Sequence, residues 1–139
     1  MKLLEKIARI VMIVLNAFLS LTGFLGGIGL LARLNAPPVE QLQGSVFKDF
    51  TIPGLALLVF VGGGALWATI LLVRKSKYAI LFSTTAGIII MFFEFVEVLI
   101  IGSPPGVARA LQIFYFGLGT LIVVASLGTW FLKLLVEQK

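Results

Sequence analysis

Four long runs of apolar residues dominate the hydropathy pattern of this chain, at about 7–34, 52–73, 78–101 and 107–136. Each is long enough to cross the roughly 30 Å hydrocarbon layer of a membrane, which takes about 20 apolar residues in a helix. The strict alternation of apolar and polar positions that marks a membrane β-strand is absent. The pattern therefore predicts an all-α membrane protein, a single domain over 1–139 built as an antiparallel bundle of four transmembrane helices.

The segments between the runs differ in length. The first outer loop, at 35–51, contains Pro37 and Pro38, which stop the first helix because proline cannot donate a backbone hydrogen bond. Its segment VEQLQGSVFKDF mixes apolar and polar residues and predicts a short amphipathic element at the membrane surface. The second outer loop, GSPPG at 102–106, predicts a tight hairpin. The first run is longer than the apolar core of a signal peptide, about 7–15 residues, and is predicted to be a retained span.

Composition agrees with a membrane location, since 60% of the residues are hydrophobic, only 12% are charged and the mean hydropathy is +1.14. A soluble domain carries about a quarter charged residues, so this chain lacks the polar surface to cover a globule. The absence of cysteine and histidine excludes thiol chemistry and metal sites built on thiolate or imidazole. We therefore predict no metal and no cofactor. An enzyme is the least expected class, because no His or Cys is present to activate a nucleophile.

The basic residues are distributed unevenly between the two sides that four spans would define. The side of the termini would hold eight of the eleven, namely Lys2, Lys6, Arg9, Arg74, Lys75, Lys77, Lys133 and Lys139. An excess of Lys and Arg marks the cytoplasmic side, which predicts that both termini and the RKSK turn at 74–77 are cytoplasmic. The net charge of +5 is then mainly a consequence of this membrane topology. The basic residues beside the membrane are also expected to attract anionic lipid headgroups modestly. Nucleic-acid binding is not expected, because elements that read bases are missing.

The candidate chemistry lies in FEFVEVLIIGSPPG, at 93–106. Glu94 and Glu97 stand three residues apart in an apolar run and so share one face of a helix. Relative to a span centre near residue 90, they lie about 6 Å and about 10 Å toward the outer side, at a rise of 1.5 Å per residue. An ionised acid at mid-depth costs on the order of 2.5–3.5 kcal/mol. Glu94 should therefore be protonated, paired or hydrated, and should face the bundle interior.

Two interpretations of these carboxylates are open. In the first, arginines at the end of the first span and the start of the fourth pair with them and clasp three helices together, and breaking such a pair costs roughly 3–5 kcal/mol. In the second, the carboxylates line an outward-facing cavity and bind a cation, a proton or a small solute. Going back along the third span from Glu94, Gly87, Thr84 and Ser83 form a stripe of small and polar residues, which adds Thr84 as a candidate. The aromatic start of the fourth span adds Tyr115. The predicted binding residues are Glu94, Glu97, Arg33, Arg109, Thr84 and Tyr115.

Glycine is concentrated within the spans, most densely as GGG at 62–64. Small residues let helix backbones approach closely in lipid, so close packing is the stronger expectation. The alternative is a hinge or half-unwound segment of the kind that lines transporter sites. Asn16, an amide within the first apolar run, is expected to hydrogen-bond across helices.

Two stretches resemble a family of small bacterial four-span membrane proteins to which no activity is assigned. They are TIPGLALLVFVGGGALWATILL at 51–72 and VEVLIIGSPPGVARALQIFYFGLGTLI at 96–122. The shared pattern is Ile-Pro-Gly at the start of the second span, Gly-Gly-Gly within it, a glutamate-bearing third span that ends in Ile-Gly, and an aromatic-rich start of the fourth. The resemblance covers the last three spans. It implies this topology in a bacterial cytoplasmic membrane and implies no activity.

Three function classes follow from these observations. The first is transport or channel-like binding at the outward-facing acidic site, in a homo-oligomer, because four short spans rarely enclose a pathway alone. The second is a non-catalytic accessory or scaffold subunit whose glycine-rich faces bind a partner membrane subunit. The third is a lipid-binding protein with a pocket between the long outer loop and the third span.

Overall fold

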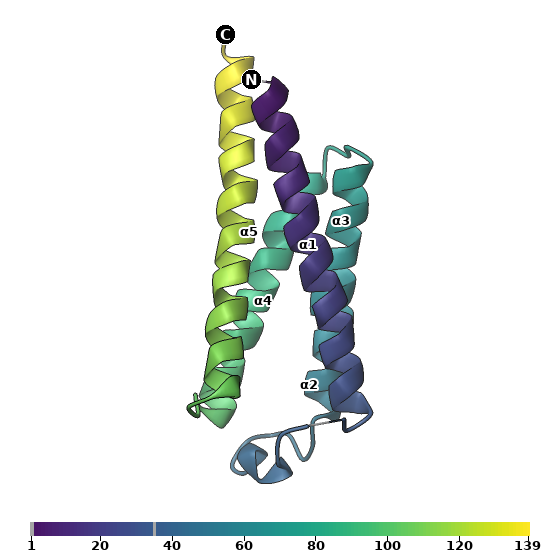
Figure 1. Ribbon diagram of the computed structural model, residues 1–139, viewed down its shortest axis with the longest axis vertical. Helices are drawn as coiled ribbons and strands as arrows, with labels where there is room; N and C mark the ends of the chain where they lie inside the picture. Colours follow the sequence, from purple (N-terminus) through teal and green to yellow (C-terminus); the bar gives the residue numbers. More distant parts are fainter. Residues whose placement is uncertain (1, 35) are drawn as a thin grey trace.

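The computed structural model describes residues 2–34 and 36–139, which form helices joined by turns and one long loop (Figure 1). No strand occurs in this part of the chain, and four of its helical segments are long and apolar enough to cross a membrane, so the all-α membrane prediction is confirmed. Residue 35, the first of the predicted outer loop, lies outside the described residues. The helices are α1 (Lys2–Leu31), α2 (Thr51–Ala56), the π-helix η2 (Leu57–Gly63), α3 (Gly64–Val73), α4 (Ala79–Ile101) and α5 (Val107–Glu137). The segments α2, η2 and α3 follow one another without a break and form the second span.

The first helix differs most from its predicted bounds, because α1 begins at Lys2 and ends at Leu31 instead of covering 7–34. The early start is explained by its charged first turns, which are helical although they are too polar for the hydrocarbon layer. The end is set by a left-handed residue, Arg33, with φ of 59°. Leu34 N donates to Gly29 O at 2.8 Å across that residue, as in the usual glycine-terminated helix end.

The same helix ending occurs at α3, where Lys75 has φ of 55° and Ser76 N donates to Leu71 O at 3.0 Å. Glycine is the residue that normally takes this conformation, and a side chain there costs about 1–2 kcal/mol. Arg33 and Lys75 therefore place a cation at a strained position where it faces the negative end of a helix dipole.

The two ends of the chain lie together at one end of the bundle, while the long loop and the GSPPG turn lie at the other (Figure 1). We call these the termini end and the loop end. The helices form two hairpins, α1 with the second span and α4 with α5, and the hairpins meet where α3 packs on α4 and α1 on α5. Toward the loop end the hairpins diverge in Figure 1.

Glycines bring the two helices of each hairpin into close contact. A Cβ atom on Gly23 of α1 would lie 2.9 Å from Gly62 N, and one on Gly87 of α4 would lie 2.8 Å from Gly119 O. The expectation of close packing is confirmed, because only glycine allows these backbones to approach so far. The alternative of an unwound segment at 62–64 is wrong, since the helix continues through it, wound as a π-helix up to Gly63.

The bundle interior combines an apolar core with one chain of polar side chains. Leu19, Val61, Ala65, Ile90 and Ile122 are among the core residues, which come from all four spans. Toward the termini end, Asn16 Nδ2 donates to Ser83 Oγ at 2.9 Å, and Ser83 Oγ lies 2.7 Å from Ser126 Oγ. All three are completely buried and they join α1, α4 and α5, which confirms the expectation for Asn16.

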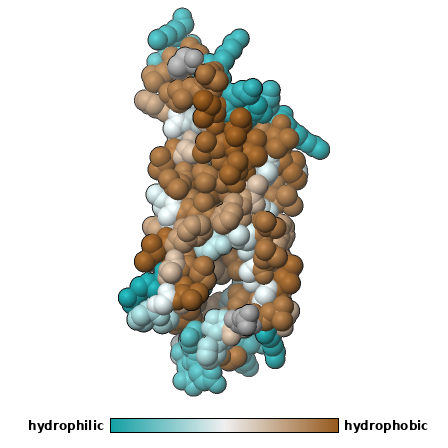
Figure 2. All heavy atoms as spheres, in the orientation of Figure 1, coloured by the Kyte–Doolittle hydropathy of each residue, from teal (hydrophilic) through white to brown (hydrophobic). Residues whose placement is uncertain are grey.

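The surface is apolar around the middle of the molecule. Figure 2 shows a broad hydrophobic band with hydrophilic side chains gathered at the two ends. Only 22–33% of each apolar window is buried inside the bundle, so most of its large side chains face outward. A surface of this kind is stable only in contact with lipid or another apolar surface, because folding of the bundle leaves these side chains exposed.

Candidate functional site

Glu94 lies on the face of α4 that is buried in the bundle. Ser83, Gly87, Ile90 and Glu94 follow one another at intervals of three or four residues, and all four are buried. That spacing keeps side chains on one face of a helix, so the predicted stripe is present. Only 7% of Glu94 is exposed, which makes it the one buried ionisable side chain of the described residues.

Glu97, one turn further along α4, is tied to α5 by Gln112. Gln112 Nε2 donates to Glu97 Oε2 at 3.0 Å and to Gly102 O, in the tight turn, also at 3.0 Å. Sequence reasoning missed Gln112. The sequence does indicate it. The short turn at 102–106 places residues before it opposite residues after it, and Gln112 is the first amide side chain after the turn that comes opposite Glu97.

The predicted clasp of arginines is wrong. Arg109 Nη2 donates to Ser103 O at 2.6 Å and its Nε to the same oxygen at 3.1 Å, so this guanidinium closes its own hairpin turn. Arg33 follows the end of α1 and is exposed at the surface. No Glu–Arg ion pair joins the helices within the described parts of the chain. The reason is local, since each arginine is directed by the turn that ends or begins its helix.

Asp49 itself is held by the start of the second span. Thr51 N donates to Asp49 Oδ1 at 3.0 Å, and this hydrogen bond lowers the pKa of the exposed Asp49 carboxyl, with the charge of Arg33 acting in the same direction. The loop end therefore begins its second span with a carboxylate that favours the first helical turn.

The polar cluster of Glu94, Glu97 and Gln112 is short of donors. Glu94 Oε2 and Gln112 Oε1 are buried and neither has a hydrogen-bond partner in the part of the chain that the structure describes. Gln112 Oε1 accepts hydrogen bonds, as does the carboxylate form of Glu94, and leaving a buried acceptor without a donor costs about 1–3 kcal/mol. The arrangement is suited to a group that carries N–H or O–H donors.

Besides the two arginines, two further predicted binding residues are not brought to this cluster. Thr84 Oγ1 donates to Ile80 O of its own helix at 2.9 Å, almost three turns or about 15 Å from Glu94. Tyr115 packs against the apolar core and meets the ring of Phe114 edge-on, with centroids 5.1 Å apart. Glu94 and Glu97 are thus the predicted residues that the structure brings together.

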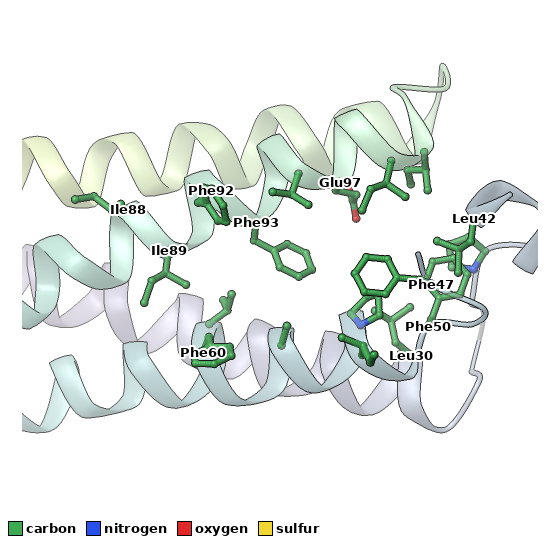
Figure 3. Close-up of a pocket in the computed structure, with 18 residues that line it drawn as sticks. Leu30, Leu42, Phe47, Phe50, Phe60, Ile88, Ile89, Phe92, Phe93 and Glu97 are labelled. Carbon is green, nitrogen blue, oxygen red and sulfur yellow. The ribbon is translucent and has the colours of Figure 1, made fainter. Parts of the chain in front are cut away.

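A cavity of about 500 Å³ opens between the second span, α4 and the long loop (Figure 3). Glu97 is the only polar side chain among the eighteen residues that line it. Phe93 and Glu97 point from α4 toward the second span and the loop, as Figure 3 shows. Along α4 the lining runs from Ile88 to Ile101, about 20 Å at the rise of a helix.

The long loop forms the outer wall of this cavity. In the segment predicted to form a short amphipathic element, it contains one 3-10 turn, η1 (Val39–Leu42). Leu42 is buried and η1 contacts α4, so the loop crosses from the first hairpin to the second. Phe47 and Phe50 of the following segment also line the cavity. The loop therefore closes the gap that the diverging hairpins leave.

The rim of the cavity lies in the apolar band of the surface. Phe60 of η2 is 62% exposed and Phe92 of α4 is 68% exposed, and both line the cavity. A molecule in the surrounding lipid can therefore reach the cavity from the side. The π-helix η2 contributes Phe60 and Val61 to this wall, and π-helical turns are frequent at functional sites.

Comparison with protein-family models, with curated proteins and with solved structures finds no match to this chain. The resemblance of residues 51–72 and 96–122 to small bacterial four-span proteins therefore stays a prediction. Any functional argument has to come from the cavity and from the polar cluster beside it.

Proposed function

We propose that the protein binds the apolar chain of a membrane amphiphile in the cavity at the loop end, with the head of that molecule at Glu97. The cavity carries this proposal, because it measures about 500 Å³ and its lining is apolar apart from Glu97. Ligand sites in proteins usually measure about 300–1,000 Å³ and combine apolar walls with a few polar groups that fix orientation. The length of about 20 Å along α4 suits a linear chain.

The polar end of the cavity selects the head of the ligand. The cavity is lined by one carboxylate and by no Lys or Arg. Gln112, which donates to Glu97 and does not itself line the cavity, keeps its Oε1 without a partner. An amine or hydroxyl head supplies donors, whereas an anionic head is repelled by Glu97. We therefore propose a long-chain amine or alcohol as the class of ligand.

The proposed setting is the cytoplasmic membrane of a bacterium, with the four spans antiparallel and both termini cytoplasmic. The excess of basic residues toward the termini supports this orientation. The cavity then opens in the outer half of the bilayer. The proposed function is binding without a chemical step, because the chain contains no His or Cys to activate a nucleophile.

The test uses hexadecylamine with a photoreactive diazirine at the end of its chain, added to the protein in phosphatidylcholine nanodiscs. Labelled residues are mapped by peptide mass spectrometry. We expect labels at the deep end of the cavity, at Phe60, Ile88 and Ile89, and a weaker yield with palmitic acid carrying the same group.

Two variants of α4 serve as a matched pair. Val96 lines the cavity and Val98 does not, so Val96→Phe fills the site and Val98→Phe adds the same volume outside it. We expect Val96→Phe to abolish labelling at Ile88 and Ile89, and Val98→Phe to leave it unchanged. Labelling spread over lipid-facing residues such as Leu121, with no effect of Val96→Phe, would contradict the proposal.

A second function, uptake of a proton or cation, is supported by the carboxyl pair. Glu94 and Glu97 lie one turn apart on α4, and Glu94 is buried. Two neighbouring acids share one proton more readily than they both ionise. Transport by this pair would need a second copy of the chain or a partner membrane subunit, because four spans seldom enclose a pathway.

Carbodiimide labelling across pH tests this second function, with Glu94→Gln as the control. We expect labelling of the native protein that depends on pH, is blocked by a bound cation and is absent in Glu94→Gln. A native protein that is not labelled at any pH would rule out the exchange of protons at this pair.

A further inference from the structure

A second pocket, of about 380 Å³, lies at the termini end, whereas the cavity proposed to bind an amphiphile, called the amphiphile cavity below, lies at the loop end. Three segments form it: the first turns of α1, the turn between α3 and α4, and the last turns of α5. The helices α1 and α5, with 30 and 31 residues, extend beyond that turn (Figure 1). The turn thus forms the floor of the pocket and the two longer helices form its walls.

The walls carry a concentration of positive charge. Lys2, Lys6 and Arg9 of α1, Lys75 of the turn and Lys133 of α5 line the pocket, against a single acid, Glu5. Lys2, Lys6 and Arg9 recur at helical spacing and so share one face of α1. Like charges one turn apart destabilise an isolated helix. This arrangement therefore favours an anion that sits between them.

Lys75 is directed to the pocket by a strained backbone. It has φ of 55°, a conformation in which glycine is usual, and its amide closes the end of α3 by donating to Leu72 O at 3.2 Å. A lysine at this position adds a cation from the floor to those of the walls. Below them the pocket reaches Met12, Leu72 and Ala79, which form an apolar cluster.

Topology alone does not explain this placement. The excess of cations that orients a membrane protein needs only to lie near the membrane on one side. Arg74, Lys77 and Lys139 also belong to this end and do not line the pocket. Five cations from three separate segments do line it, next to the apolar cluster of Met12, Leu72 and Ala79. That combination matches a phosphate group joined to an apolar molecule, as in basic pockets between spans that bind phospholipid heads.

We propose that this pocket binds a phosphate-bearing anion, whose source is the headgroup of an anionic phospholipid in the leaflet next to the termini. Free inorganic phosphate has the same charged group, so the experiment separates the two. The site is independent of the amphiphile cavity, since the two pockets have no lining residue in common.

The experiment compares two triple variants that remove the same charge from the same end. Lys6→Gln, Arg9→Gln and Lys75→Gln change the pocket, while Arg74→Gln, Lys77→Gln and Lys139→Gln change its surroundings. Each protein is placed in phosphatidylcholine nanodiscs, without and with phosphatidylglycerol, and in a third arm with inorganic phosphate. Melting temperature reports binding, and native mass spectrometry reports the phosphatidylglycerol retained.

We expect phosphatidylglycerol to stabilise the native protein and the control variant, and its apparent affinity for the pocket variant to fall about a hundredfold. The same pattern with inorganic phosphate alone would support an anion site in this pocket and would identify its ligand as a soluble phosphate. Equal losses in both triple variants, or no stabilisation of the native protein by either anion, would overturn the proposal.

A single substitution tests the pocket without the risk that a triple variant misfolds. Lys75→Gly removes one cation and favours the left-handed end of α3. We expect it to melt higher than the native protein in phosphatidylcholine and to gain less from phosphatidylglycerol. A gain equal to that of the native protein would contradict a role for Lys75 in the pocket.

Discussion

The two ends of the bundle bury polar side chains in different ways. Toward the termini end, Asn16, Ser83 and Ser126 connect three helices through neutral groups, and Asn16 Oδ1 has no hydrogen-bond partner among the described residues. Toward the loop end, the cluster of Glu94, Glu97 and Gln112 connects α4 with α5 only and contains two carboxyl groups. The first arrangement fastens helices together. Both leave acceptors without a donor, but only the second has a member, Glu97, that lines a cavity, which is what a binding site requires.

The course of α1 explains this difference. At the level of Asn16 it lies against α4 and α5, so their side chains meet. At the loop end it stays with the second span, where Gly27 lies so close that an added Cβ would be 2.8 Å from Leu58 N. The space between the hairpins is then left to Phe47 and Phe50 of the loop, which fill only part of it.

The largest loss of stability is expected from a substitution at the point where α4 and α5 cross, between the two ends of the bundle. In Gly119→Ala, the new Cβ would lie 2.7 Å from Gly87 O, so the helices must separate, and we expect a loss of about 3 kcal/mol. Gly117→Ala is the matched control, because nothing lies within 4 Å of its Cβ. It should be neutral or gain up to about 1 kcal/mol. Unfolding in mixed micelles measures both, and equal stability of the two variants would contradict the crossing.

A smaller effect is expected from the donor at the loop end. Gln112→Leu removes the hydrogen bond to Glu97 and should cost about 2 kcal/mol, as for bonds to charged groups. A double-mutant cycle with Glu97→Gln isolates that bond. We expect the two substitutions together to cost less than their sum. Strict additivity would mean that Gln112 acts through Gly102 alone.

Breaking the chain of polar side chains toward the termini end should lower the stability less. Ser83→Ala breaks its links to Asn16 and Ser126, and such bonds between membrane helices contribute about 1 kcal/mol. Thr85→Ala on the same helix is the control, because its hydroxyl bonds Leu81 O of its own helix and faces outward. Photolabelling of the cavity by the diazirine amine should be the same in both variants. A change in labelling with Ser83→Ala would show that the two ends are coupled.

The smallest effect is a pH dependence of the loop end. The pKa of Asp49 lies below its ordinary value of 3.8 because Thr51 N donates to its carboxylate. A group with a depressed pKa contributes above its unfolded-state pKa and loses that contribution as pH falls through its folded-state pKa. We expect hydrogen exchange at the Thr51 amide to speed up below that range, relative to the amides of α4. Asp49→Asn should remove the pH dependence, and its persistence would point to another group.

Sequence reasoning found the features that depend on local periodicity. The four apolar helices followed from hydropathy, and the burial of Glu94 followed from spacing along one helix together with the free energy of burying a charge. Both depend on residues within a few turns. Gln112 could have been found by the same reasoning applied across the tight turn at 102–106.

The features that sequence reasoning did not find depend on how separate segments meet. The arginine clasp was wrong because the turn after Leu31 leaves Arg33 exposed at the surface and the hairpin turn captures Arg109. The cavity depends on the divergence of two hairpins and on the path of the long loop. The π-helix in the second span has no marker in the hydropathy pattern, because its residues are as apolar as those around it.

That π-helix has a consequence for the way the second span divides its contacts. Its hydrogen bonds reach one residue further than those of an α-helix, so each turn from Leu57 to Gly63 takes up extra chain and shifts the rotational phase of everything beyond it. The half before it packs on α1, with Gly54 against Leu30 and Leu31, and the half after it packs on both α1 and α4. A single-residue deletion in this segment would rotate one half against the other and bring their contacts out of phase without breaking the helix.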